Sequence, residues 1–339
     1  MNKSAVNELF RTPVSVPPPL RPLGVGDGSV LLGSCFAEHV GRRMSDAQLS
    51  VTVNPLGVLY NPLSIVRVLK RAVSDAPLTR PADYVRHGEM WHTWLGDSTL
   101  SAPTQEECRR QTEEALAKLH EALAEADNLF LTLGTSRYYL YKGTRACVAN
   151  CHRIPGAEFD ETEAEVDEIV EQLDEALTAL HGLNSRLQVV LTVSPYRYAK
   201  YGMHESQLAK ARLLLAAESF RLRHPDRVSY FPAYEIVMDE LRDYRFYASD
   251  MLHPAEQAVD YIWRRLCETW ADDGLQTYLA RWESVRRALL HRPINPRDPA
   301  TETFRQRTRE QLEALRRDYP MLRILPHGEP ADPFNPQNP

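Results

Sequence analysis

Two side chains that can act as nucleophiles, Ser34 and Cys35, stand next to each other near the start of the sequence. They follow an apolar run that ends in Gly33, and a helical pattern begins after them. A strand that ends in small residues and leads into a helix exposes side chains beside free backbone N–H groups, which can hold an anion. A thiol at such a helix start has a lowered pKa. The stretch predicts a nucleophile turn, and the alternative interpretation is that Cys35 is a buried, inert residue.

A carboxylate and an imidazole, Asp250 and His253, lie three residues apart near the other end of the chain, just before a helical pattern. This spacing allows His253 to act as a general base while Asp250 fixes its tautomer. The alternative interpretation is a helix-capping Asp beside a surface His. Together with a nucleophile turn at the other end of the chain, the pair becomes a stronger indication of nucleophilic catalysis.

A zinc site is a weaker alternative, because Cys147, Cys151 and His152 lie close together in the sequence. A tetrahedral site needs a fourth ligand, and no matching pair lies nearby, so we expect no metal. We also expect no organic cofactor. Three further basic residues are interpreted as solvated helix surface: Lys200, Lys210 and Arg212.

Several elements must position these residues. Buried strands are predicted over 29–32, 51–53, 128–133, 188–193 and 228–231. Helices are predicted over 38–48, 63–73, 104–126, 161–181, 205–221 and from Pro254 to 269, and the chain stays helical to about 315 with a break at 291–293. A loop is predicted over 54–62, a hairpin over 84–95, and strands and turns over 137–153.

Apolar strands that alternate with helices predict a parallel sheet covered on both faces. Ligands of such sheets bind beyond the carboxyl ends of the strands. Three polar turns follow predicted strands there: Gly33-Ser34-Cys35, Gly134-Thr135-Ser136 and Ser194-Pro195. Their convergence predicts a site at this edge, although small residues also occur in tight turns for purely structural reasons.

Composition narrows the class of protein. The 339 residues carry 40 Lys and Arg against 46 Asp and Glu, a net charge of −6, which argues against a nucleic-acid binder. No apolar run approaches the roughly 18 residues of a membrane span, and the Pro-rich start lacks the core of a signal peptide. Five sparse cysteines suit a reducing compartment. We therefore expect a cytoplasmic protein.

The chain resembles the GSCFA-domain family at several motifs between about residues 29 and 305. They are Gly33-Ser34-Cys35-Phe36-Ala37, Asn54-Pro55-Leu56-Gly57 with Tyr60-Asn61-Pro62, Leu133-Gly134-Thr135, Asn150-Cys151-His152, Thr192-Val193-Ser194-Pro195, and Leu241-Arg242-Asp243-Tyr244-Arg245-Phe246-Tyr247 leading to Asp250-Met251-Leu252-His253-Pro254. The family in turn resembles the SGNH/GDSL hydrolase superfamily. This resemblance implies a flavodoxin-like three-layer α/β/α sandwich with a central parallel sheet and, here, a helical C-terminal extension.

The resemblance also implies roles for individual residues. In the Gly-Asp-Ser block of the superfamily, Gly33 and Ser34 match the first two positions and Cys35 matches the nucleophile. The backbone N–H groups of Cys35 and Gly57 are implied oxyanion donors. Gly134, Thr135 and Ser136 match the Gly-x-Asn block, in which Ser136 replaces the Asn. Asp250 and His253 match the last block unchanged. The set of expected substrate-binding residues is completed by Asn54 and Ser194.

The implied function is an esterase or acyltransferase that works through an acyl-enzyme on an ester or thioester, such as an O-acyl glycan or a lipid-like substrate, with an acyl-CoA or an acyl carrier as a candidate donor. The rival hypothesis is a module of the same fold that binds a glycan or an acyl carrier without turnover. Three segments are predicted: a Pro-rich arm (1–28), the catalytic domain (29–272), and a helical extension and tail (273–339).

Overall fold

The computed structural model describes residues 11–74, 78–291, 294–295 and 298–322. A central sheet of five parallel strands is built from β1 (Ser29–Gly33), β2 (Val51–Val53), β5 (Asn128–Leu133), β9 (Gln188–Val193) and β10 (Val228–Tyr230). Their lateral order is β10-β9-β5-β1-β2. The predicted parallel α/β sheet and its strands are therefore confirmed.

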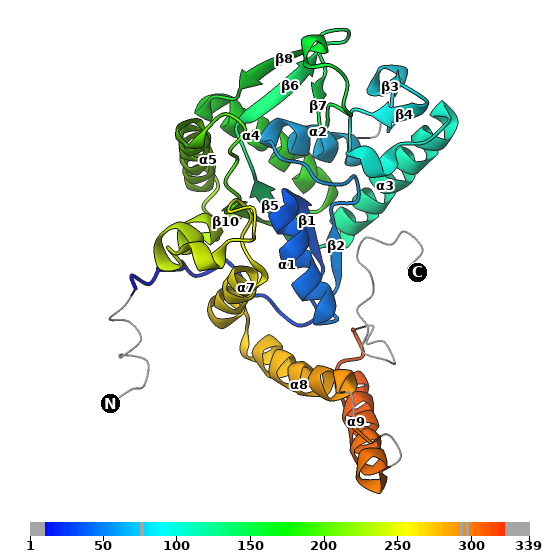
Figure 1. The fold of residues 1–339 in the computed structure, drawn as a ribbon, viewed down its shortest axis with the longest axis vertical. Coiled ribbons are helices and arrows are strands. Elements are labelled where there is room, and N and C mark those ends of the chain that lie inside the picture. Colours follow the sequence, from blue (N-terminus) through cyan, green and yellow to red (C-terminus); the bar gives the residue numbers. More distant parts are fainter. Residues whose placement is uncertain (1–10, 75–77, 292–293, 296–297, 323–339) are drawn as a thin grey trace.

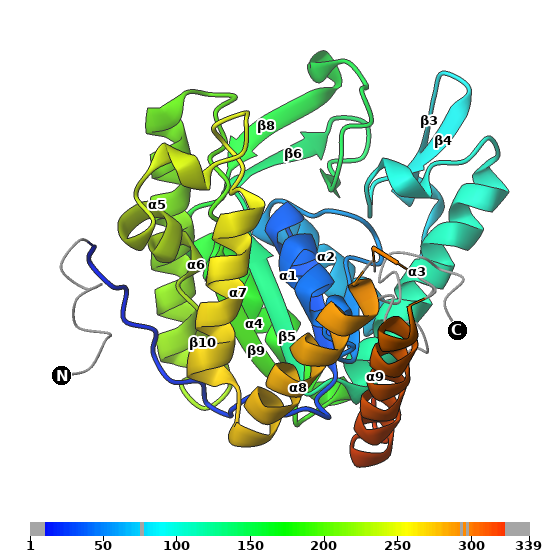
Figure 2. The ribbon, with the colours of Figure 1, turned by 60° about the horizontal axis from the view of Figure 1, so that its bottom comes forward.

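Helices cover both faces of the sheet (Figure 1, Figure 2). One face carries α2 (Pro62–Ala72), α3 (Gln105–Glu125), α4 (Val166–Leu183) and α5 (Met203–Arg223). The other carries α1 (Cys35–Asp46) and α7 (Glu256–Trp270), extended by α8 (Asp273–Leu290) and α9 (Pro299–Asp318). Successive side chains of a buried strand face opposite sides, so Val30 and Leu32 pack in one core cluster and Leu31 in the other.

Two small antiparallel sheets lie at the end of the molecule where α1 begins (Figure 2). One is the hairpin of β3 (Tyr84–His87) and β4 (Met90–Thr93), as predicted. The other joins β6 (Arg137–Tyr141), β7 (Cys147–Val148) and β8 (Phe159–Glu163). Helices α8 and α9, the predicted C-terminal helical extension, lie at the opposite end (Figure 1).

Short helical turns connect these elements. They are η2 (Pro81–Asp83), η3 (Ser98–Leu100), η4 (Gly156–Glu158), α6 (Ala233–Glu235), the π-helix η5 (Ile236–Glu240) and η6 (Tyr244–Phe246). The arm preceding β1 runs over the surface of the α7 side. There Trp270 Nε1 donates to the Pro17 carbonyl at 2.8 Å, and Leu23 forms a bridge with Ala271. Residues 1–10 of the predicted arm lie outside the described residues, and the division of the chain at residue 28 stays a prediction.

Three predicted helix boundaries were wrong. Helix α1 begins at Cys35 and not at Glu38, because the Ser34 hydroxyl caps it by accepting from Phe36 N at 3.3 Å. The segment Glu161–Glu163 belongs to strand β8, because Phe159 is buried and the alternating acidic side chains pair with β6. Helix α7 begins at Glu256, since Pro254 is held in a bridge with Tyr247.

Candidate functional site

Three polar turns meet at the carboxyl edge of the central sheet, as the sequence predicted. Gly33 ends β1, Gly134 follows β5 and Ser194 follows β9, and these strands are neighbours in the sheet. The connection from β1 runs to β2 on one side and the chain then returns to β5 on the other, so the strand order reverses between β1 and β5. In open α/β sheets, ligands bind at such a switch point.

The nucleophile turn separates Ser34 from Cys35 by burial. Gly33 has φ of 135°, and a Cβ there would lie 2.2 Å from the Thr132 carbonyl oxygen, so a side chain does not fit. Ser34 is fully buried, and its hydroxyl is used as the helix cap. Cys35 is the first residue of α1 and is partly exposed. Of the two candidates, only Cys35 keeps exposed surface.

The thiol of Cys35 is a protonated group at rest. Burial raises its pKa to about 11, and the Glu38 carboxylate one turn along α1 adds to this. The opposing effects of Lys210 and of the N–H groups of Phe36 and Cys35 are smaller. The expected lowering of the pKa by the helix start was therefore wrong, because desolvation of the thiolate outweighs the field of a few backbone N–H groups.

The predicted pair of Asp250 and His253 is formed. His253 Nδ1 and Asp250 Oδ2 are 2.5 Å apart, and the other carboxylate oxygen accepts from the backbone N–H groups of Leu252 and His253. The hydrogen bonds from His253 hold the pKa of Asp250 at about 2. The imidazole also stacks on Tyr196 with a centroid distance of 4.2 Å. Because Nδ1 is engaged, Nε2 is the nitrogen left to accept a proton.

The thiol and the imidazole share an environment without touching. Burial is the main cause that raises the pKa of Tyr60 to about 12, and Cys35 and Tyr196 add to it. Burial also raises the pKa of Tyr196, with smaller contributions from Cys35 and Asp250. Among the described residues, however, no hydrogen bond joins Cys35 to His253.

Asn54 organises the loop that crosses this edge. Its side-chain oxygen accepts from Gly33 N at 2.9 Å, and its amide nitrogen lies 3.5 Å from a Glu38 oxygen. Its backbone has φ of 39°, and its carbonyl accepts from Gly57 N at 2.8 Å. The predicted binding residue Asn54 therefore holds the nucleophile turn in place with its polar atoms.

The remaining turn residues have mostly structural partners. The Gly57 N–H is engaged with Asn54, and Gly134 N and Thr135 N both donate to the Tyr60 carbonyl, at 2.8 and 3.0 Å. The Gly57 N–H can therefore bind an oxyanion only if its hydrogen bond to the Asn54 carbonyl is shared. Ser136 is buried and its hydroxyl has no partner among the described residues, whereas Thr135 lines the pocket described next. The Ser194 hydroxyl accepts from Tyr196 N at 3.4 Å.

A pocket of about 300 Å³ opens beside His253. Four tyrosines contribute to its wall, together with polar and small residues. The lining residues are Tyr60, Asn61, Thr135, Arg137, Tyr139, Val148, Ala149, Asn150, Cys151, Tyr196, Tyr198 and His253. The charge of Arg137 is already balanced, since its guanidinium lies within 4 Å of Glu161, Glu163 and Glu205. The pocket is therefore polar and aromatic without a free strong charge.

A family model, the GSCFA family, matches residues 29–266, and a second, the GSCFA domain protein C-terminal domain, matches residues 282–324. The first match spans the whole sheet and every residue of the site described above. The chain belongs to the GSCFA family. No curated protein matches it.

Lys210 is a residue of the candidate site that the sequence did not reveal. It was expected on solvated surface, but it is 2% exposed and its Nζ donates to the carbonyls of Gly134 and Ser194 at 2.6 and 2.7 Å. It thus ties together the ends of β5 and β9. Burial lowers its pKa to about 7, while Cys35 opposes the shift. A lysine in a helix gives no sequence signal of this kind, because burial depends on the sheet below it.

The three residues considered for zinc lie apart. The thiol of Cys147 lies against Ser64, Cys151 faces the pocket, and His152 is buried with its ring nitrogens near the Thr93 carbonyl and the Ser98 hydroxyl. Within residues 11–74, 78–291, 294–295 and 298–322, no three metal-ligating side chains form a group. Asn150 and Cys151 instead line the pocket, whereas His152 does not. The pocket residues Tyr139 and Tyr198 were not predicted.

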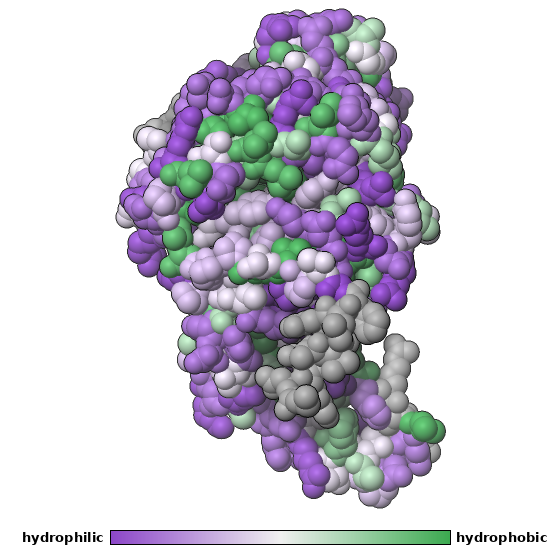
Figure 3. Space-filling model, turned by 90° about the vertical axis from the view of Figure 1, so that its left-hand side faces the viewer, coloured by the Kyte–Doolittle hydropathy of each residue, from purple (hydrophilic) through white to green (hydrophobic). Residues whose placement is uncertain are grey.

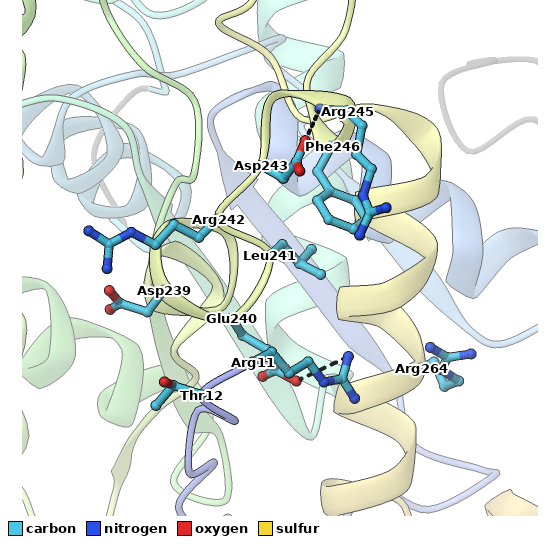
Figure 4. Close-up of a pocket in the computed structure, with 10 residues that line it drawn as sticks. All are labelled: Arg11, Thr12, Asp239, Glu240, Leu241, Arg242, Asp243, Arg245, Phe246 and Arg264. Atoms are coloured by element: carbon cyan, nitrogen blue, oxygen red, sulfur yellow. Dashed lines mark hydrogen bonds and ion pairs between the residues drawn. The ribbon is translucent and has the colours of Figure 1, made fainter. Parts of the chain in front are cut away.

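A second cavity, of about 670 Å³, lies between the arm, η5 and α7 (Figure 4). It contains none of the predicted site residues. Arginines and carboxylates alternate along its wall, as in the contact between Arg11 and Glu240, which are 3.8 Å apart. None of the helices in the described part of the chain combines the length and the apolar composition that crossing a membrane requires.

Proposed function

We propose that this GSCFA protein is an SGNH-type hydrolase or acyltransferase that uses Cys35 as its nucleophile on an ester or thioester. The observation that carries the proposal is the position of an accessible thiol and the Asp250–His253 pair at one sheet edge, beside a pocket. Ser34 is the less suitable nucleophile because it is buried and caps α1.

The proposed reaction has two steps. In the first, Cys35 Sγ attacks the acyl carbon as His253 Nε2 takes the thiol proton, and the released alcohol or thiol leaves with that proton. In the second, His253 removes a proton from water or from an acceptor hydroxyl or amine, which attacks the thioester and regenerates the thiol. Asp250 keeps the imidazole oriented and balances its transient charge.

The raised pKa of Cys35 supports a coupled attack. A thiol whose pKa is about 11 is protonated near neutral pH, so it needs a base in the step itself. The Cys35 N–H at the helix start is the candidate donor to the developing oxyanion, because the Phe36 N–H is engaged by the Ser34 hydroxyl. The Gly57 N–H can join it only if its bond to the Asn54 carbonyl is shared.

The pocket favours a hydroxylated substrate over a long acyl chain. Tyrosine faces stack well on sugar rings, and the amides of Asn61 and Asn150 can bond hydroxyl groups. Only Val148 and Ala149 are aliphatic in its wall. We therefore place an O-acyl glycan ahead of a lipid-like ester, with an acyl-CoA or an acyl carrier as the candidate donor. We also propose a cytoplasmic location, as the odd, sparse cysteines suggest.

The test is the intact mass of the protein after mixing with a panel of acyl thioesters and activated esters. We expect a mass gain equal to the acyl group, lost in Cys35→Ala, and peptide mapping should place it on Cys35 and not on Cys151. The matched control is Cys267→Ala, which removes a thiol on α7 away from the pocket. Full ester turnover by Cys35→Ala would overturn the proposal.

A non-catalytic glycan-binding or carrier-binding module is the second candidate. The missing hydrogen bond between Cys35 and His253 favours it. It predicts saturable binding of acetylated oligosaccharides that survives Cys35→Ala, with no acyl-enzyme. A mass gain on Cys35 that decays upon addition of an acceptor contradicts this alternative.

A further inference from the structure

Helix α5 presents a row of leucines on its outer face. Leu208, Leu215 and Leu222 recur at every seventh position and are 40%, 60% and 61% exposed. Its inner face is also apolar, with Leu213, Ala217 and Phe220 buried against the core. Figure 3 looks onto the side of the molecule that carries α5, and hydrophobic surface gathers there. A helix that is apolar on both sides needs a partner for its outer side.

The outer row is shaped for another helix. Ala211 and Ser219 lie one turn before and one turn after Leu215 on the same ridge of the helix. Small residues at these positions leave grooves on both sides of the Leu215 side chain. A second helix that crosses at Leu215 can therefore approach closely.

The row is also complementary to itself. Residues equally far from Leu215 match in pairs: Leu208 with Leu222, and Ala211 with Ser219. Three residues from the centre, Arg212 on one side corresponds to Glu218 on the other, so two antiparallel copies bring opposite charges together. Within one subunit Arg212 lies 2.8 Å from Glu163 and Glu218 lies 2.8 Å from Arg221, so both side chains would share these partners with the other copy. Such a match is what a two-fold symmetric interface requires.

We propose that the outer face of α5 is the interface of a homodimer, in which two α5 helices cross antiparallel with the two-fold axis at Leu215. This proposal is independent of the catalytic one. Each subunit buries its leucine row against its partner, and Arg212 of each copy faces Glu218 of the other.

Analytical ultracentrifugation of the full chain over about 1–100 µM tests the proposal. We expect a monomer–dimer equilibrium and at least a tenfold weaker association for Leu215→Glu, because each dimer then contains two facing carboxylates. Leu290→Glu is the matched control, since Leu290 on α8 is equally exposed at 61% and should leave the dimer unchanged. A monomeric wild type, or a Leu215→Glu protein that still dimerises, overturns the proposal.

Cross-linking tests the geometry. A cysteine on the axis faces its own copy, so Leu215→Cys should form a disulfide-linked dimer on mild oxidation. Leu222→Cys is the control with matching exposure. Residue 222 lies about 10 Å along the helix from the two-fold axis, so the introduced thiols of two subunits cannot reach each other. Mixing Leu208→Cys with Leu222→Cys protein should give a linked heterodimer. If Leu215→Cys and Leu222→Cys form disulfide-linked dimers to the same extent, the proposed crossing of the two helices at Leu215 is contradicted.

Discussion

At the scale of single residues, the nucleophile turn places two neighbouring side chains in opposite roles. Ser34 turns inward and closes the helix start, while Cys35 is partly exposed and feels the charges of Glu38 and of the buried Lys210. The result is a thiol with a raised pKa, which depends on His253 for its activation. The two electrostatic neighbours of this thiol can be tested separately.

Replacing Glu38 should make the thiol more reactive. The carboxylate is the second cause of the raised pKa of Cys35, after burial. Glu38→Gln keeps an oxygen for the Asn54 amide but removes the charge. We expect alkylation of Cys35 by iodoacetamide at pH 9 to accelerate roughly threefold. Mass spectrometry of the Cys35 peptide measures the rate, and an unchanged or slower rate would show that Glu38 does not act on the thiol.

Replacing Asp250 should slow the chemistry without unfolding the protein. Asp250→Asn removes the charge that orients and balances His253, and we expect acyl-enzyme formation to slow by about 100-fold or more. The pKa of Asp250 is lowered to about 2, so its carboxylate stays ionised as the pH falls through its usual value of 3.8. If the wild-type rate of acyl-enzyme formation falls with decreasing pH above pH 4, the group that takes up the proton must then be one other than Asp250. A rate that falls with an apparent pKa near 3.8 would contradict this assignment.

At the scale of elements, the site depends on how strand β1 passes into helix α1. Gly33 lies against the Thr132 backbone of β5, and the Asn54 side chain holds its N–H from the loop after β2. Three neighbouring strands therefore fix the direction in which α1 leaves the sheet. The position of the thiol follows from that direction.

A methyl group at Gly33 should damage this junction. Gly33→Ala adds an atom 2.2 Å from a backbone oxygen at a backbone angle that side chains rarely adopt. We expect the free energy of unfolding to fall by about 3 kcal/mol. The matched control is Gly88→Ala, with φ of 60° but nothing within 4 Å, which should cost only about 1 kcal/mol. Urea unfolding followed by circular dichroism compares the two, and equal losses would show that the close approach to β5 is unimportant.

At the scale of the whole molecule, the two faces of α5 serve different purposes. Its inner face carries Lys210 under the sheet edge, and its outer face carries the leucine row. At the other end, α8 anchors the C-terminal helices to α1, because Tyr278 OH and Trp282 Nε1 donate to the carbonyls of Ala47 and Asp46. We therefore expect the free energy of unfolding to depend on Lys210 at one end of the sheet and on the α8 contacts at the other.

Lys210 should give stability a pH dependence. Its pKa is about 7 in the folded protein and 10.5 in the unfolded chain, so the unfolded chain binds the extra proton between these values. The free energy of unfolding of the wild type, relative to Lys210→Met, should therefore rise between pH 7 and pH 10, by at most about 1.4 kcal/mol per pH unit, and be constant below pH 6.

Urea titrations of both proteins at pH 6 to 9.5 measure this difference. Lys118→Met, which replaces an exposed lysine on α3, is the control and should show no such trend. A wild type that loses stability relative to Lys210→Met as the pH rises would mean that Lys210 keeps its charge in the folded state, held by the two carbonyls.

The sequence by itself determined the features that depend on near neighbours. The strands and most helices followed from apolar periodicity, and the Asp250–His253 bond follows from a three-residue spacing that a single turn can close. The parallel sheet then placed three polar turns at one edge, because its strands all run in one direction. Predicted boundaries failed where capping or pairing by other residues decided them, as at Cys35 and β8.

Only the tertiary structure decided which of these groups are accessible and how they are charged. Burial of Ser34, desolvation of Cys35 and Lys210, and use of the Gly57 N–H within its own loop all depend on atoms that come from distant parts of the chain. The same holds for the tyrosine pocket, whose walls come from five separate segments, and for the exposed row on α5. Solvation and hydrogen-bond competition are properties of the packed molecule, so local sequence does not determine them.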